Sequence, residues 1–280
     1  MANKRLVIFA LVLGGALMIP GFSRLCRAAD VEVKVPSGID HSAWDRLLKK
    51  YVDDKGLVNY AGWTNNKEDI DALDSYLKQF APKPERPAEG NEKAATLVNA
   101  YNAFTIRTIL GAYPVESIHE ISKPFETKQW TIGGEKVALN DIEHGTLRPM
   151  LKYRAHSVLV CAARSCPPLQ RSAYSADAFD SQDATAYTHW LAREDLNRFM
   201  PEQNKAEVSS IFKWFKSDFD ASKAVAKIFA EYGPRSAKEL SAGGKQFDIS
   251  YLSYNWGLND QGEHGRHYSK LKLLFDHLSK

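Results

Sequence analysis

The sequence predicts a mostly helical α+β fold in a single domain over residues 40–260, around a small, mainly antiparallel sheet. Two observations predict this class. Segments with apolar residues at helical spacing are long and frequent, whereas the strand candidates are few and short. No internal repeat and no clear linker divides the chain, so we expect one globular unit.

The strongest helix is predicted over residues 92–112, where apolar side chains cover most of the circumference and indicate a buried position. Asn99 and Asn102 interrupt this surface. A buried amide needs hydrogen-bond partners, so these residues either tie down loops or face a pocket. Further helices are predicted over 41–52, 70–80, 176–193, 209–219 (with its aromatic residues in the core) and 222–232. Strands are predicted over 57–60, 157–161 and 247–254, with a hairpin of 130–132 and 136–139.

Residues 1–28 have the three-part pattern of a secretory signal peptide. Lys4 and Arg5 precede an uncharged apolar run, and Ala28 and Ala29 offer small residues for cleavage. The apolar run is shorter than the roughly 20 residues of a membrane-spanning helix, and no second long run follows. We therefore expect an exported protein, periplasmic or secreted, with no membrane span after cleavage.

Removal of this leader changes the charge and the cysteine count of the protein. Residues 1–28 hold four basic residues and no acidic one, so the formal charge falls from +3 to −1. A near-neutral domain argues against nucleic acid as a partner. Only Cys161 and Cys166 remain, too few for a disulfide framework, so a hydrophobic core must stabilise the fold. Residues 261–280 are predicted to be a polar tail, helical from about Tyr268.

Several motifs carry a resemblance to a known family. They are Asn99-Ala-Tyr-Asn102, Asp141-Ile-Glu-His-Gly-Thr-Leu-Arg148, Cys161-Ala-Ala-Arg-Ser-Cys166 and the aromatic segments 210–219 and 251–256. On these motifs the chain resembles, over nearly its whole mature length, the bacterial and plant family called domain of unknown function 547. The resemblance implies no settled activity. Plant members often have serine where Cys166 lies, which implies a role other than pairing for the first cysteine.

Cys161 is the sharpest candidate for chemistry. It ends a predicted buried strand and enters an irregular loop, and Arg164 nearby would stabilise a thiolate, the reactive form of the side chain. His144 would act as the base of a cysteine-dependent hydrolase or transferase on a peptide-like or small-molecule substrate. The candidate catalytic residues are Cys161, His144, Glu143 and Asn102, with Asp141 as an alternative orienting group, and the candidate substrate-binding residues are Asn99, Arg148 and Arg164.

Other interpretations of the two cysteines stay open. A disulfide between Cys161 and Cys166 is the usual outcome in an exported protein, and it would leave a non-catalytic binding or scaffold domain. A metal site would need more ligands than His144 and His156 supply, and two inert thiols are another alternative. A thiol–disulfide role is a further possibility, although the spacing is wider than that of the Cys-x-x-Cys redox motif. We predict no metal and no cofactor. A catalytic site would bring Cys161 and His144 to one cleft beside the N-terminal half of the 92–112 helix.

Overall fold

The computed structural model describes residues 32–220, 224–242 and 246–268. The predicted signal peptide and the C-terminal helix expected beyond residue 268 lie outside these ranges. The helices are α1 Ser42–Tyr51, α2 Tyr60–Thr64, α3 Lys67–Lys78, α4 Gly90–Ala112, α5 Leu139–Ile142, α6 Arg148–Leu151, α7 Ala155–Val158, α8 Phe179–Leu191, α9 Ile211–Trp214, α10 Lys216–Asp220, α11 Ala224–Tyr232 and α12 Arg235–Ala242. The strands are β1 Trp130–Ile132, β2 Glu135–Val137, β3 Arg198–Met200, β4 Lys205–Val208 and β5 Asp248–Tyr251.

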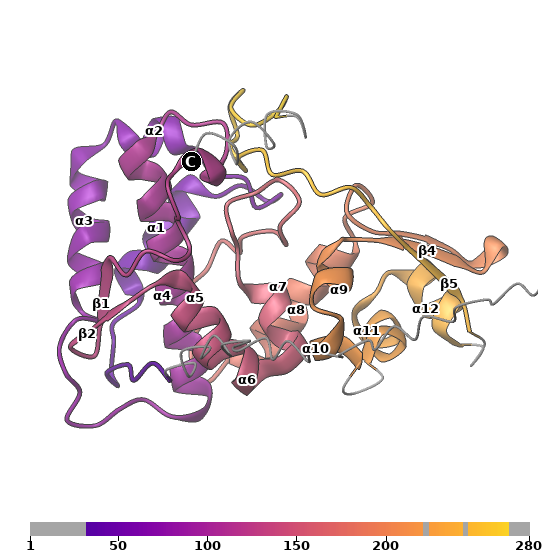
Figure 1. The fold of residues 1–280 in the computed structure, drawn as a ribbon, viewed down its shortest axis with the longest axis horizontal. Coiled ribbons are helices and arrows are strands. Elements are labelled where there is room, and N and C mark those ends of the chain that lie inside the picture. The colour runs from indigo at the N-terminus through magenta and orange to yellow at the C-terminus, as the bar shows by residue number, and fades with distance from the viewer. Residues whose placement is uncertain (1–31, 221–223, 243–245, 269–280) are drawn as a thin grey trace, which may run out of the picture.

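Helix α4 is the centre of the N-terminal half of the fold. Every residue from Lys93 to Ile106 is buried, as the apolar circumference of this segment predicts. Helices α1, α2 and α3 lie beside it (Figure 1) and contribute large buried side chains such as Trp44, Trp63 and Leu73. The helices predicted over 41–52, 70–80 and 92–112 are therefore confirmed, with small shifts at their ends.

A second hydrophobic cluster lies in the C-terminal half, where Trp190, Phe212 and Phe229 pack together with apolar residues of the strands β3, β4 and β5. β3 pairs antiparallel with β4, and β5 pairs parallel with β4. The predicted hairpin forms β1 and β2, at the opposite end of the molecule from the three-stranded sheet (Figure 1). The α+β class is confirmed, but the strands form two small sheets and not the single sheet that we expected.

Two of the predicted strands are wrong. Residues 157–161 enter from α7, a single helical turn, and continue as extended chain outside any sheet. The Asn102 side chain takes the place of a neighbouring strand, because its amide donates to the Val158 carbonyl at 2.9 Å and accepts from the Val160 N–H at 2.9 Å. Residues 57–60 make isolated backbone pairings at Val58, and α2 already begins at Tyr60.

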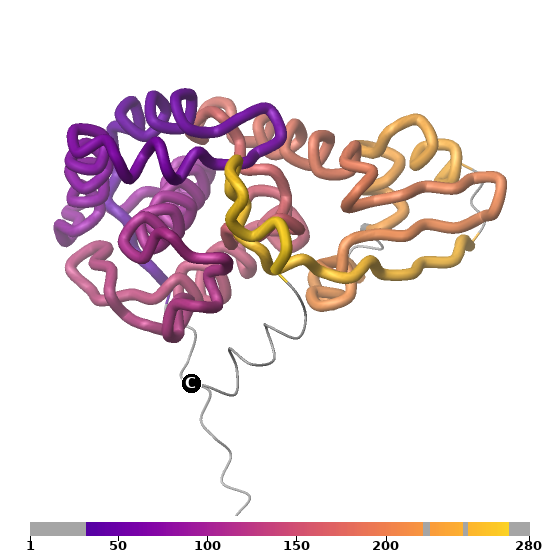
Figure 2. Tube along the Cα trace, turned by 90° about the horizontal axis from the view of Figure 1, so that it is seen from above, coloured from indigo at the N-terminus to yellow at the C-terminus, as the bar shows by residue number. Residues whose placement is uncertain are grey.

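The chain after β5 crosses back to the N-terminal half, as the yellow segment in Figure 2 shows. There Asn259 donates its N–H to the Ala162 carbonyl at 3.0 Å, and its own carbonyl accepts from the Val58 N–H at 2.8 Å. The side chain of Gln261 donates to the carbonyls of Tyr51 and Leu57. Gln261, the first residue of the predicted polar tail, is thus hydrogen-bonded to the N-terminal half of the protein.

Candidate functional site

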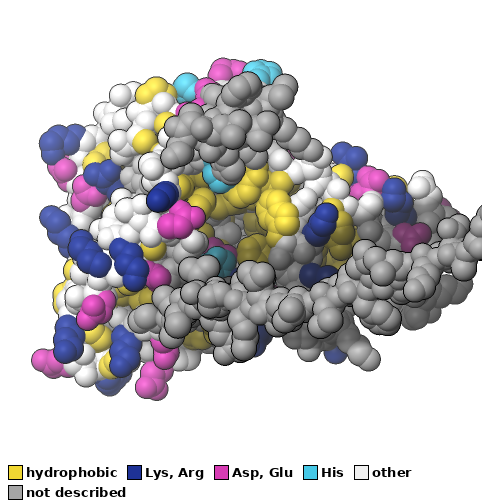
Figure 3. Space-filling view, in the orientation of Figure 1, with side chains coloured by type: hydrophobic (Ala, Val, Ile, Leu, Met, Phe, Trp, Pro, Cys, Tyr) yellow, Lys and Arg dark blue, Asp and Glu magenta, His cyan; other side chains and the backbone are white. Residues whose placement is uncertain are grey.

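A cleft of about 220 Å³ opens where the two hydrophobic clusters meet. Figure 3 shows hydrophobic side chains gathered around a hollow in the middle of one face of the molecule. Six of the fifteen lining residues are Phe, Tyr or Trp, and the polar and sulfur groups among the rest are one carboxylate, one amide, two imidazoles and two sulfur atoms. The lining residues are Tyr101, Phe125, Asn140, Glu143, His144, His156, Leu159, Cys161, Cys166, Pro167, Ile211, Trp214, Phe215, Tyr254 and Trp256.

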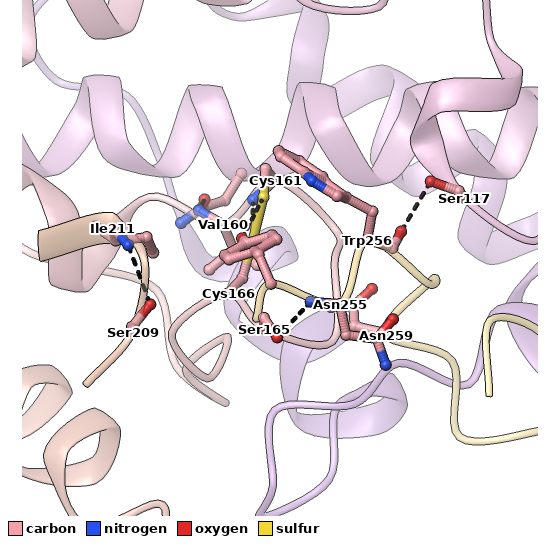
Figure 4. The surroundings of a disulfide bond; sticks show 12 residues. Ser117, Val160, Cys161, Ser165, Cys166, Ser209, Ile211, Asn255, Trp256 and Asn259 are labelled. Carbon is pink, nitrogen blue, oxygen red and sulfur yellow. Dashed lines mark hydrogen bonds between the residues drawn. A yellow bond between two sulfur atoms is a disulfide. The ribbon is translucent and has the colours of Figure 1, made fainter. Parts of the chain in front are cut away.

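The two sulfur atoms of this cleft are joined. Cys161 and Cys166 form a disulfide, and the Trp256 ring lies beside it (Figure 4). The Tyr254 hydroxyl is 3.2 Å from each sulfur, and the backbone N–H of Cys161 donates to the Cys166 sulfur at 3.1 Å. Because a nucleophilic cysteine must be a free thiolate, Cys161 cannot attack a substrate in this state.

The disulfide loop is held by the segment that returns from β5. Arg164 donates its N–H to the Gly257 carbonyl at 2.8 Å, and Ser165 donates its N–H to the Asn255 carbonyl at 3.2 Å. The Ser165 hydroxyl accepts from the Asn255 N–H at 2.9 Å (Figure 4). These bonds fix the position of Trp256, between the two acceptors, relative to the sulfur atoms.

Glu143 and His144 begin a π-helical turn, Glu143–Leu147, between α5 and α6, and both face the cleft. Such wide turns occur often at functional sites. The Glu143 side chain is only 14% exposed, and its Oε2 accepts from the Tyr101 hydroxyl at 3.0 Å. Among the described residues, no donor lies within hydrogen-bond distance of its Oε1; the nearest basic atom is His144 Nδ1, at 3.8 Å.

The tautomer of His144 follows from its arginine neighbour. Nη1 of Arg148 lies 2.8 Å from His144 Nδ1, and a guanidinium can only donate, so Nδ1 is the nitrogen without hydrogen. The hydrogen of the neutral ring is therefore on Nε2. The same Arg148 makes a bidentate pair with Asp218, at 2.7 and 3.1 Å, which holds the guanidinium in position.

Asp218 also accepts from His156 Nε2 at 2.8 Å, beneath the ring of Phe215. The hydrogen bond from His156 and the charge of Arg148 hold the pKa of Asp218 well below its usual range. Burial lowers the pKa of His156, so this imidazole is neutral near pH 7. The Arg148–Asp218 ion pair therefore has no net charge, and it holds the side chains beside the cleft wall in position.

The side chains of the remaining predicted site residues form hydrogen bonds with backbone groups. Asn99 clamps Tyr174, donating to its carbonyl at 2.8 Å and accepting from its N–H at 2.9 Å, while Asn102 clamps Val158 and Val160. Neither asparagine is among the residues that line the cleft. The Arg164 guanidinium donates to the carbonyls of Asp260 and His264, so its donors are directed at the C-terminal segment. Asp141 accepts from the Ala138 N–H at the start of α5.

The sequence does not predict several of the cleft residues, among them the aromatic residues Tyr254, Trp256 and Trp214. The first two lie in the 251–256 motif, which was their available signal. Trp214 was expected in a helix core, but it is 48% exposed, whereas Phe212 beside it is buried as expected. Over the described residues, no group of three or more His, Cys, Asp or Glu side chains is placed to hold a metal. The helices of that part of the chain include none long and apolar enough to cross a bilayer.

Residues 86–191 match the model of a family described as protein of unknown function, DUF547. This segment is of the DUF547 family. The match confirms the family that the motifs indicate, although it covers a shorter stretch than the predicted mature chain. The DUF547 segment holds both cysteines and the π-helical turn, whereas the aromatic wall of Trp214, Tyr254 and Trp256 lies beyond it. No curated protein and no solved structure matched the chain.

Proposed function

We propose that this chain is an exported, non-catalytic binding protein whose cleft takes a small ligand with a compact cationic group. The observation that carries the proposal is the Glu143 carboxylate, largely buried among aromatic rings and with one oxygen left for a ligand. A cation is attracted both by a carboxylate and by the faces of aromatic rings. The cleft, at about 220 Å³, suits a small molecule or a single head group.

The aromatic side of the cleft supports this ligand class. Trp214 and Trp256 stack with their ring centroids 5.8 Å apart, and Tyr254 lies 4.7 and 4.6 Å from them. The three rings form a continuous wall, and the disulfide loop holds the backbone of the segment that carries Tyr254 and Trp256. Such a wall offers ring faces to a cation and also excludes water, which strengthens the attraction.

The charges around the cleft also favour a cation. Arg148 and Asp218 neutralise each other through their bidentate contact, Nδ1 of His144 accepts from Arg148, and burial lowers the pKa of His156. Glu143 is left as the carboxylate of the cleft wall, and among the described residues the nearest basic atom to its Oε1 is His144 Nδ1, at 3.8 Å. A neutral or anionic ligand would leave this charge uncompensated, which is costly in a largely buried position.

The arrangement gives less support to a cysteine-dependent hydrolase. Cys161 is held in the disulfide, so the nucleophile would first have to be released by reduction. His144 would then have to accept a proton, but Nδ1 already accepts from Arg148 and Nε2 carries the hydrogen. A thiol enzyme therefore requires two rearrangements, whereas binding requires none.

Export is supported by the leader pattern of residues 1–28 and by the disulfide, because disulfides persist mainly in oxidising compartments.

Calorimetric titration with choline and its neutral isostere 3,3-dimethyl-1-butanol tests the binding. We expect choline to bind at least about tenfold more tightly, since a desolvated cation–π contact is worth about 2 kcal/mol. Glu143→Gln and Trp214→Ala should each weaken the binding of choline. Tyr251→Ala is the matched control, because Tyr251 is also exposed and lies outside the cleft lining. Equal affinity for the two probes, or no effect of Glu143→Gln, would refute the proposal.

A further inference from the structure

The two sulfur atoms of the disulfide have unequal surroundings. Both residues line the cleft, but Cys161 is partly exposed and Cys166 is 4% exposed. A thiolate in the cleft therefore meets the Cys161 sulfur first. Accessibility is one of the factors that decide which sulfur of a disulfide is attacked.

The hydrogen bonds around the disulfide favour Cys166 as the leaving group. A disulfide sulfur has no hydrogen, so the Tyr254 hydroxyl donates, at 3.2 Å from each sulfur. Cys166 has a second donor, the Cys161 N–H at 3.1 Å. Burial, together with the charge of Glu143, raises the pKa of Tyr254, which keeps this hydroxyl protonated. Hydrogen bonds to the charged form lower the pKa of a thiol, and a thiol of lower pKa leaves faster.

The loop has supports that do not depend on the S–S bond. Asn255 and Gly257 accept the N–H groups of Ser165 and Arg164, and the Cys166 N–H donates to the Ala163 carbonyl at 3.0 Å. Asn102 holds Val160, immediately before the loop. The two sulfurs should thus stay near each other after the bond opens, so that it can re-form.

We propose that this disulfide is a thiol–disulfide exchange site for small thiols that enter the cleft. The thiolate of the entering molecule forms a bond to the Cys161 sulfur, and the bond between Cys161 and Cys166 breaks. Its electron pair goes to Cys166, which leaves as a thiolate held by the Tyr254 hydroxyl and the Cys161 N–H. A second thiolate then attacks the mixed disulfide, releasing Cys161 as a thiolate and the thiol as its dimer. The thiol is oxidised and the protein disulfide is reduced by the same two electrons.

The test uses cysteamine, a small cationic thiol, at about pH 8, where part of it is thiolate. The oxidised mature protein is incubated with cysteamine, quenched with N-ethylmaleimide and mapped by mass spectrometry. We expect cysteamine on Cys161 and maleimide on Cys166, formed at least about tenfold faster than with the oxidised peptide Cys-Ala-Ala-Arg-Ser-Cys. A rate no faster than that of the peptide, or cysteamine on Cys166 in place of Cys161, would overturn the proposal.

Two variants test the role of the hydroxyl. Tyr254→Phe should slow the exchange roughly three- to tenfold, because it removes one donor from the leaving sulfur. Tyr251→Phe, which removes a hydroxyl three residues away, should leave the rate unchanged, and equal rates for the two variants would count against the mechanism. Only the choice of a cationic thiol rests on the proposed function. If that function is right, mercaptoethanesulfonate, an anionic thiol, should react more slowly than cysteamine. Choline binding without exchange overturns this proposal only, and exchange without choline binding overturns the proposed function only.

Discussion

Asn102→Ala should strongly destabilise the protein, although Asn102 is not one of the residues that line the cleft. Asn102 is 3% exposed, and its side chain satisfies the Val158 carbonyl and the Val160 N–H, on residues that are 1% and 3% exposed. Each buried backbone group left without a partner costs about 1–3 kcal/mol. The two together predict a loss of about 2–6 kcal/mol, a large fraction of the stability of an ordinary domain.

Urea unfolding at neutral pH without reductant, followed by circular dichroism, measures this loss. Asn91→Ala is the matched control, because Asn91 is an exposed asparagine of the same helix with a single 3.2 Å contact to Asp180. The control should cost less than about 1 kcal/mol, as surface substitutions usually do. A change of that small size for Asn102→Ala would refute the argument that this amide replaces a neighbouring strand.

Three further predictions concern pH, processing and the disulfide. Burial lowers the pKa of His41 from 6.5 to about 4, so the unfolded state binds the proton first. The free energy of unfolding should therefore fall by roughly 3 kcal/mol as the pH drops through this window, and urea unfolding of His41→Gln should lack that fall. Mass spectrometry of the secreted protein should show cleavage after Ala28 or Ala29, and an intact Met1 would contradict this. The same protein, alkylated with iodoacetamide without reduction, should carry no label, and fast labelling of Cys161 would contradict the disulfide.

The helices were the most predictable part of the fold, for a local reason. The apolar pattern of 92–112 extends over many turns, and no other structure can bury such a surface. The predicted helix therefore agrees with α4 nearly to its ends. The segment 157–161 is short and apolar, and such a run suits a strand or a buried coil equally well. Its state is decided by Asn102, which is 56 and 58 residues away from its partners. No local pattern contains that information.

The candidate site shows the same division. Motifs alone bring Glu143, His144 and Cys161 into view, and the structure places all three at one cleft. Their chemistry, however, depends on contacts that join distant segments. Tyr254 reaches the sulfurs across 88 and 93 residues, and Asp218 reaches Arg148 across 70. A sequence pattern can therefore name the residues of this cleft without assigning their roles.

The role of His144 depends on a residue one helical turn away. Arg148 follows at a spacing that places two side chains on the same side of a helix, so a contact between them was foreseeable. The effect of this contact on His144 was not foreseeable, because an arginine without a second partner is flexible and would leave the imidazole free to accept a proton. Asp218 removes this freedom by holding the guanidinium with two hydrogen bonds, and His156 in turn fixes Asp218. The chain from His156 to Asp218 to Arg148 thus sets the tautomer of His144, and with it the choice between a base and a donor at the cleft wall.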